Sequence, residues 1–94
     1  FEDVTPHGQL LGNLQAVADA QERHYAERGS FAEWLRSLGI EPTGADVRMT
    51  LMHGDADRWE AVAYHTIGLT CTREGRVVDG VPRSDPPVCF TTAP

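Results

Sequence analysis

The spacing of the apolar residues changes near the middle of this chain, and this change limits the fold more than any other feature. Up to about residue 38, apolar side chains recur every three or four positions, which is typical of amphipathic helices. From about residue 46 they alternate with polar side chains, which is typical of strands. Helices followed by strands predict an α+β fold, and a length of 94 residues predicts one domain over 1–94.

The first part carries the signals of a long helix over 5–28. Thr5 offers a hydroxyl that caps free N–H groups, and Pro6 fits the first helical turn. Gly29 is typical of a helix end because glycine adopts the left-handed conformation at little cost. We expect Asn13 on the solvent face of this helix. The expected inner face carries Leu10, Leu14, Val17, Ala18, Gln21 and Tyr25.

A short second helix is expected over 30–38. Ser30 and Glu33 have the spacing of a capping box, in which each residue satisfies a free backbone donor of the first turn. Phe31 and Trp34 would then lie on the inner side of this helix. We therefore expect Trp34 in the core.

An antiparallel sheet of three or four strands is expected over 46–78. Residues 54–57 and Glu74–Gly75 are typical of the turns that separate strands in a meander. Ala61 and Ala63 make one strand face small, which favours close approach of the long helix across that face. The expected strands cover 47–52, 59–66, 69–72 and 76–78.

Cys71 and Cys89 are the two cysteines of the chain. Three interpretations are open: the cysteines are bonded to each other, they bind a metal, or they are two free thiols in the core. A zinc site would need histidines to complete its ligand set. We favour the disulfide, which would close the proline-rich tail over 79–94 and stabilise the fold by about 3 kcal/mol. Such a bond persists outside the cytoplasm, so an extracytoplasmic location is predicted, in the periplasm or at the cell surface.

Two segments carry a resemblance to a known family. Residues 20–32 closely fit the pattern aq-x-x-Yya-x-x-G-x-[YF]a, which ends the long helix in the soluble heads of type IV pilins and type II secretion pseudopilins. Residues 59–65 are similar to a later strand of that family, and the late cysteine pair is a further similarity. The resemblance runs from about Leu10 to Cys89. It implies a long helix on an antiparallel sheet, contacts with neighbouring subunits, and a contact surface on the loop between the cysteines.

The N-terminus departs from the family pattern. Phe1 is followed by polar residues, where pilins have an apolar segment that anchors and polymerises the subunit. We expect either that this segment has been removed or that the domain works in a setting that needs no filament.

The charge of the chain limits its partners. The formal net charge is −6, and all eight basic residues are arginines. An acidic surface repels phosphate backbones, so we expect no nucleic-acid partner, and membrane contact only through partners or an N-terminal anchor. The serines lack the context of a nucleophile, and there is no haem motif or glycine-rich phosphate loop. We therefore expect neither an enzyme nor a cofactor.

A metal site is the alternative for the residues around the first hairpin. His53 and His65 flank the expected turn, where Asp55 and Asp57 add carboxylates. Alternating carboxylates also occur in calcium loops, but the other residues of an EF-hand are missing from the sequence. A solvated hairpin tip is the simpler interpretation, so we expect no metal.

Contact with other proteins is the predicted function. The partners would be copies of this chain in a polymer, or the subunits of a larger membrane-bound complex. The alternatives are an accessory subunit that braces or caps a secretory or energy-transducing complex, and a small periplasmic metal- or ligand-binding module. Trp59 and Phe90 are expected in the core more than at the surface, yet either could anchor a partner. The contact candidates are Asp55, Asp57, Trp59, Pro82, Arg83, Pro86, Pro87 and Phe90.

Overall fold

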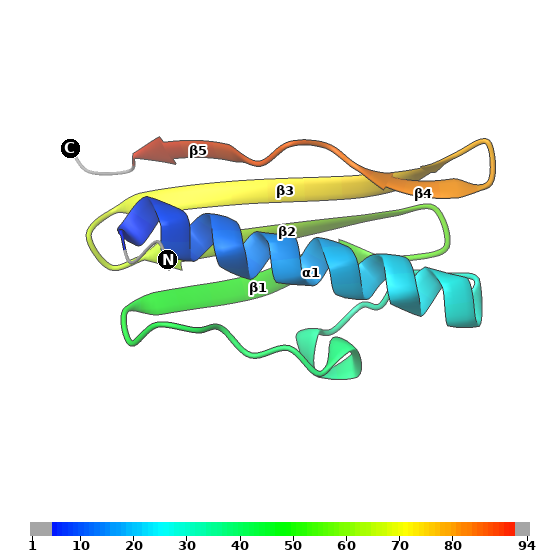
Figure 1. Cartoon of the computed structure of the whole chain (residues 1–94), viewed down its shortest axis with the longest axis horizontal. Helices are drawn as coiled ribbons and strands as arrows, with labels where there is room; N and C mark the ends of the chain where they lie inside the picture. The colour runs from blue at the N-terminus through cyan, green and yellow to red at the C-terminus, as the bar shows by residue number, and fades with distance from the viewer. Residues whose placement is uncertain (1–4, 92–94) are drawn as a thin grey trace.

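One long helix lies across one face of an antiparallel sheet, as the α+β prediction requires (Figure 1). The computed structural model describes residues 5–91. The sheet has five strands, where three or four were expected. The elements are α1 (Pro6–Arg28), the 3-10 helix η1 (Leu35–Leu38), β1 (Val47–Gly54), β2 (Arg58–His65), β3 (Leu69–Val78), β4 (Val81–Ser84) and β5 (Val88–Thr91).

Local signals place the two ends of α1 where the sequence predicts them. The Thr5 hydroxyl accepts a hydrogen bond from the Gly8 N–H at 3.1 Å. At the other end, Gly29 adopts a φ of 74° and donates its N–H to the Tyr25 carbonyl at 2.8 Å. Both caps satisfy backbone groups that the helix itself leaves unpaired.

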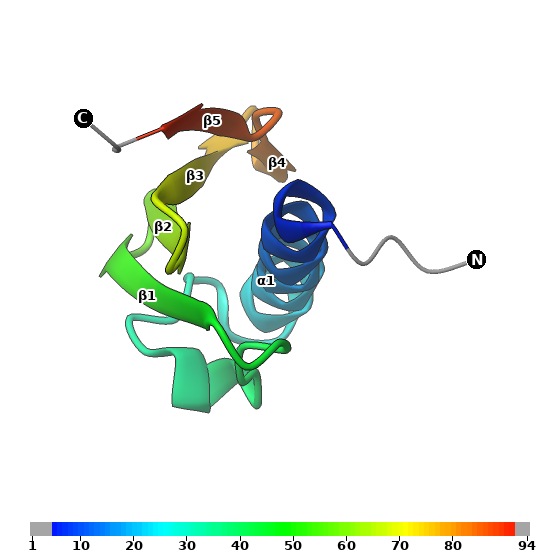
Figure 2. The same cartoon turned by 90° about the vertical axis from the view of Figure 1, so that its left-hand side faces the viewer.

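The core lies between α1 and the face of the sheet that α1 covers, which we call the inner face (Figure 2). Leu10, Leu14 and Val17 of the helix are fully buried. Opposite them, Ala61 and Ala63 of β2 are also fully buried. The small side chains bring the helix close to the strand, as the sequence predicts.

The outer edge of β3 is covered by two short strands rather than one. Residues 75–78 of β3 pair with β4, and residues 69–72 pair with β5. The prolines of the tail over 79–94 favour an irregular loop, but residues 81–84 and 88–91 belong to the sheet. The other strands follow in the order β1-β2-β3.

The turn expected at Glu74–Gly75 is wrong, because both residues lie inside the continuous strand β3. Gly75 pairs directly with Trp59 of β2. A Cβ at Gly75 would overlap the Trp59 indole. Gly75 therefore provides room for the Trp59 ring. Close approach of a neighbouring group, like a turn, is a common reason for a glycine next to or within a strand.

The expected helix over 30–38 is also wrong apart from its last turn, Leu35–Leu38. The preceding segment is extended because tertiary hydrogen bonds hold its backbone. Phe31 donates its N–H to the Asp55 carbonyl at 2.9 Å. Ala32 donates to Gln21 Oε1 at 2.8 Å and accepts from Gln21 Nε2 at 3.0 Å. Consequently Trp34 is 59% exposed, not in the core.

Asn13 lies on the buried side of α1, not on the solvent face where the sequence placed it. Its side-chain oxygen accepts a hydrogen bond from the Thr43 N–H at 2.8 Å. Its amide group donates to the Thr43 carbonyl at 3.1 Å. The residue therefore fixes the loop that leads into β1.

Candidate interaction surface

The face of the sheet away from α1, which we call the outer face, carries two rows in which apolar side chains of β2 and β5 flank a threonine of β3. Tyr64 of β2, Thr70 of β3 and Phe90 of β5 are neighbours in the strand register. The next row contains Val62, Thr72 and Val88. We call these six residues the apolar rows.

Three large side chains of the apolar rows are open to solvent, whereas Thr70 is buried between two of them. Val88 is 63% exposed, Phe90 48% and Tyr64 38%. α1 packs on the opposite face (Figure 2). Large apolar side chains that are neighbours on an open sheet face are typical of protein-binding surfaces.

Charged side chains occupy the other end of the outer face. Arg58, Arg76 and Arg83 are neighbours across β2, β3 and β4. Between this arginine row and the apolar rows, Glu60 of β2 lies directly opposite Glu74 of β3. Like charges in this position repel each other, so the pair is unfavourable in the isolated chain.

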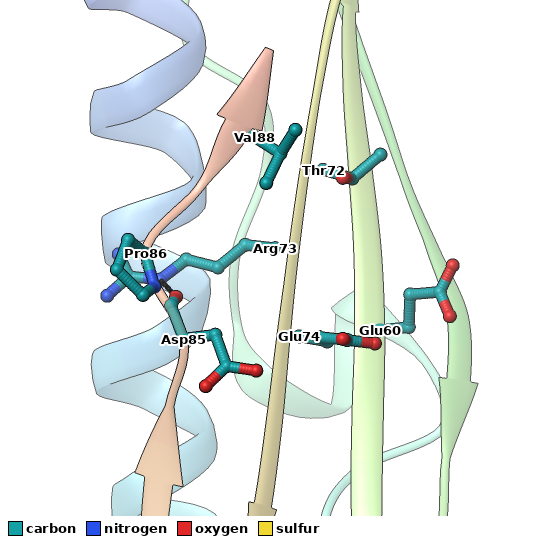
Figure 3. A pocket seen from close by; sticks show the side chains of 7 residues that line it. All are labelled: Glu60, Thr72, Arg73, Glu74, Asp85, Pro86 and Val88. Atoms are coloured by element: carbon teal, nitrogen blue, oxygen red, sulfur yellow. Dashed lines mark hydrogen bonds between the residues drawn. The ribbon is translucent and has the colours of Figure 1, made fainter.

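A hollow of about 230 Å³ lies beside the two glutamates (Figure 3). Its rim includes a third carboxylate, Asp85, which accepts a hydrogen bond from the Arg76 guanidinium at 2.9 Å. Pro86 and Val88 line the side formed by the tail. Arg73 also lines the hollow, so three carboxylates face one guanidinium; the hollow has an acidic excess and directly adjoins the apolar rows.

The predicted disulfide is present. Cys71 of β3 and Cys89 of β5 pair in the sheet register and are bonded to each other. Both side chains lie on the inner face, and Cys71 is fully buried. The bond fixes β5 at the edge of the sheet, and it is typical of an oxidising compartment.

Arg73 holds the segment between β4 and β5, a role that the sequence analysis missed. Its guanidinium donates to the Asp85 carbonyl at 3.0 Å, to Ser84 Oγ at 3.0 Å and to Gln15 Oε1 of α1 at 2.7 Å. Figure 3 shows the side chain reaching from β3 towards Pro86. The alternation in β3 was the available signal, because it places Arg73 on the same face as the buried Cys71.

The Gly54–Asp57 tip of the first hairpin is stabilised internally. The Asp55 carboxylate accepts hydrogen bonds from the Asp57 N–H at 2.8 Å and the Arg58 N–H at 2.9 Å. His53 Nε2 lies 2.7 Å from the same carboxylate. These three interactions, named in order of decreasing effect, lower the pKa of Asp55 from 3.8 to about 2.

The arrangement does not bring together the histidines considered for a metal site. His53 pairs with Glu60, near the tip of the hairpin. His65 pairs with Val47, at the opposite end of the same two strands. The two histidines therefore do not lie near each other, as the alternative of a metal site at this hairpin would require.

The lowered pKa of Asp55 predicts a pH dependence of stability. Its contribution is present above the unfolded pKa of about 3.9 and is lost as the pH falls through about 2. The difference in melting temperature between the wild type and Asp55→Ala should therefore shrink as the pH falls below about 4. An NMR titration of the Asp55 carboxyl carbon checks the cause. A midpoint close to 4 would contradict the prediction.

The predicted contact residues fall into three groups. Arg83, Pro86 and Phe90 are exposed, and Pro82 and Pro87 are half-buried; all five lie on the tail that follows β3. The preference for a core position of Phe90 is therefore wrong, because its side chain lies on the outer face of the sheet. Asp55 and Asp57 are exposed at the hairpin tip, which contacts β3 through a hydrogen bond from the Val77 N–H to the Asp57 carbonyl. Trp59 is only 2% exposed, so it is a core residue and not a surface anchor.

Comparisons with known proteins identify no family. No protein-family model matches this chain, and no curated protein matches it. The long N-terminal helix, the antiparallel sheet and the C-terminal disulfide are consistent with the fold that the pilin resemblance implies. Within residues 5–91, neither helix combines the length and the apolar character needed to cross a membrane.

Proposed function

We propose that this chain is a non-catalytic, pilin-like interaction domain of an extracytoplasmic assembly, located in the periplasm or at the cell surface. The observation that carries the proposal is the pair of apolar rows on the outer face. Their exposed side chains come from β2 and β5, and the strand register places them in the same two rows with one threonine of β3 between them. A partner seated on the rows would remove the apolar surface of Tyr64, Val88 and Phe90 from water.

The neighbouring acidic hollow adds specificity to such a contact. Glu60 and Glu74 repel each other in the isolated chain, so a basic side chain of the partner would relieve that repulsion. The apolar rows would supply most of the affinity, and the charges would select the partner and its orientation.

The disulfide and Arg73 prepare this surface in advance. Phe90 and Val88 belong to a strand that the Cys71–Cys89 bond fixes to β3. The segment before that strand is held by the Arg73 guanidinium. A surface that is already ordered loses little conformational entropy when a partner binds.

Cross-linking in the cells that make the protein tests the proposal. A photo-reactive amino acid at position 90 is expected to give one discrete adduct, identified by mass spectrometry. Adducts between copies of the chain indicate a polymer, and an adduct with a different subunit indicates the accessory role in a larger complex. Phe90→Glu should lower the yield of an adduct formed from position 88 at least about tenfold, because it buries a charge in the contact.

Position 34 provides the matched control. Trp34 is 59% exposed, close to Val88 at 63%, but it lies before η1 and beside β1, the strand at the opposite edge of the sheet from β5. Trp34→Glu should leave the adduct from position 88 unchanged. The proposal is wrong if positions 88 and 90 give no adduct, or if both glutamate variants act alike.

A further inference from the structure

His7 lies beside the disulfide at the N-terminal end of α1. One nitrogen of its imidazole and the sulfur atoms of Cys71 and Cys89 all lie within 4.8 Å of one another. Cys71 is buried, Cys89 is half-buried and His7 is exposed. The three residues come from the helix and from two paired strands, so the fold itself brings them together.

Two thiolates and one imidazole are a ligand set that zinc favours. Zinc binds sulfur at about 2.3 Å and histidine nitrogen at about 2.0–2.1 Å, so tetrahedral ligand atoms are roughly 3.5–3.8 Å apart. The separations around His7 therefore need only small side-chain movements to reach this geometry. The cysteines cannot serve while they are bonded to each other, because the metal ligand is the thiolate.

We propose that reduction of the Cys71–Cys89 bond creates a zinc site formed by His7, Cys71 and Cys89. A dithiol reductant supplies two electrons and two protons and becomes a disulfide, while the S–S bond breaks and two thiols form. One Zn²⁺ then binds both sulfurs and the imidazole nitrogen and releases the two thiol protons. The fourth position lies on the side of the exposed His7 and takes a water molecule.

The metal would take over the structural role of the bond and add a new link. Like the disulfide, it would hold β5 against β3 at residues 71 and 89. Through His7 it would also connect the first turn of α1 to this pair of strands. The site uses the inner face of the sheet and does not depend on the proposed function of the outer face.

Zinc titration of the reduced chain tests the proposal. The protein is reduced with a phosphine, and zinc binding is measured in competition with a chromophoric chelator. We expect one zinc per chain, and no binding at this site in the oxidised protein. His7→Ala should weaken binding by at least about 10- to 100-fold, the range for residues that only support metal ligands. Cobalt in place of zinc should give the absorption of thiolate–metal charge transfer.

His53→Ala is the matched control, because His53 lies near the hairpin tip and outside the three-residue group. It should bind zinc as the wild type does. If reduction unfolds the chain, zinc should restore the circular dichroism of the wild type and of His53→Ala but not of His7→Ala. The proposal is overturned if the reduced wild type binds no zinc, or if His7→Ala binds it equally well.

Discussion

Replacing Trp59 by alanine is expected to lower the free energy of unfolding by about 3–5 kcal/mol. The indole is 2% exposed and belongs to the core cluster with α1. In the strand register it lies between two glycines, Gly54 of β1 and Gly75 of β3. Neither glycine has a side chain that could fill the space, so the variant leaves a large cavity at this end of the core.

The second tryptophan is the control within the same chain. Trp34 is 59% exposed, and it makes a cation–π interaction with Arg36 at 5.9 Å. Trp34→Ala should change the free energy of unfolding by no more than about 0.5 kcal/mol. Urea unfolding followed by circular dichroism measures both variants. Similar losses in the two variants would contradict the assignment of Trp59 to the core and Trp34 to the surface.

The parts of the fold that could be predicted depend on local signals or on simple alternation. Thr5, Pro6 and Gly29 mark the ends of α1 through interactions within one helical turn. Ala61 and Ala63 show which face the helix covers, because successive strand residues point to opposite faces. The same alternation places Trp59 on that face, so its burial could be predicted from the sequence.

The failed predictions concern residues whose partners are distant in sequence. Ser30 and Glu33 have the spacing of a capping box, but the Asp55 carbonyl and the Gln21 side chain bind the backbone between them. Gly75 resembles a turn residue, but its neighbour across the sheet is the Trp59 ring. Asn13 is polar, yet its partner Thr43 lies 30 positions away. Tertiary contacts of this kind leave no periodic trace in the sequence.

The candidate surface was predicted only in part, for a related reason. The cysteine pair drew attention to the tail, where Phe90 and Arg83 are exposed. The apolar rows could not be recognised, because they need the register between β3 and β5, two strands joined by a long connection. Val88 lies two positions from Phe90 on the same strand, but Tyr64 joins the row of Phe90 only once this register is known.

Replacing Gln21 by methionine is expected to lower the free energy of unfolding by about 2–6 kcal/mol. Gln21 is fully buried, and its amide pairs with both backbone groups of Ala32, which is itself buried. Methionine fills similar space but leaves the Ala32 N–H and carbonyl without partners, at about 1–3 kcal/mol each. Both residues belong to the segment that resembles the pilin pattern, and this pairing gives a physical reason for a glutamine there. It fixes the chain that leaves α1 before η1 begins.

Two measurements separate this role of Gln21 from a general effect of the substitution. Gln15→Met, on the exposed side of the same helix, removes hydrogen bonds to Asp19 and Arg73 and should cost no more than about 1 kcal/mol. Hydrogen exchange should show that the Ala32 amide loses protection in Gln21→Met, because that amide then has no acceptor. Retained protection at Ala32, or equal losses in the two variants, would show that another contact holds the extended segment against the helix.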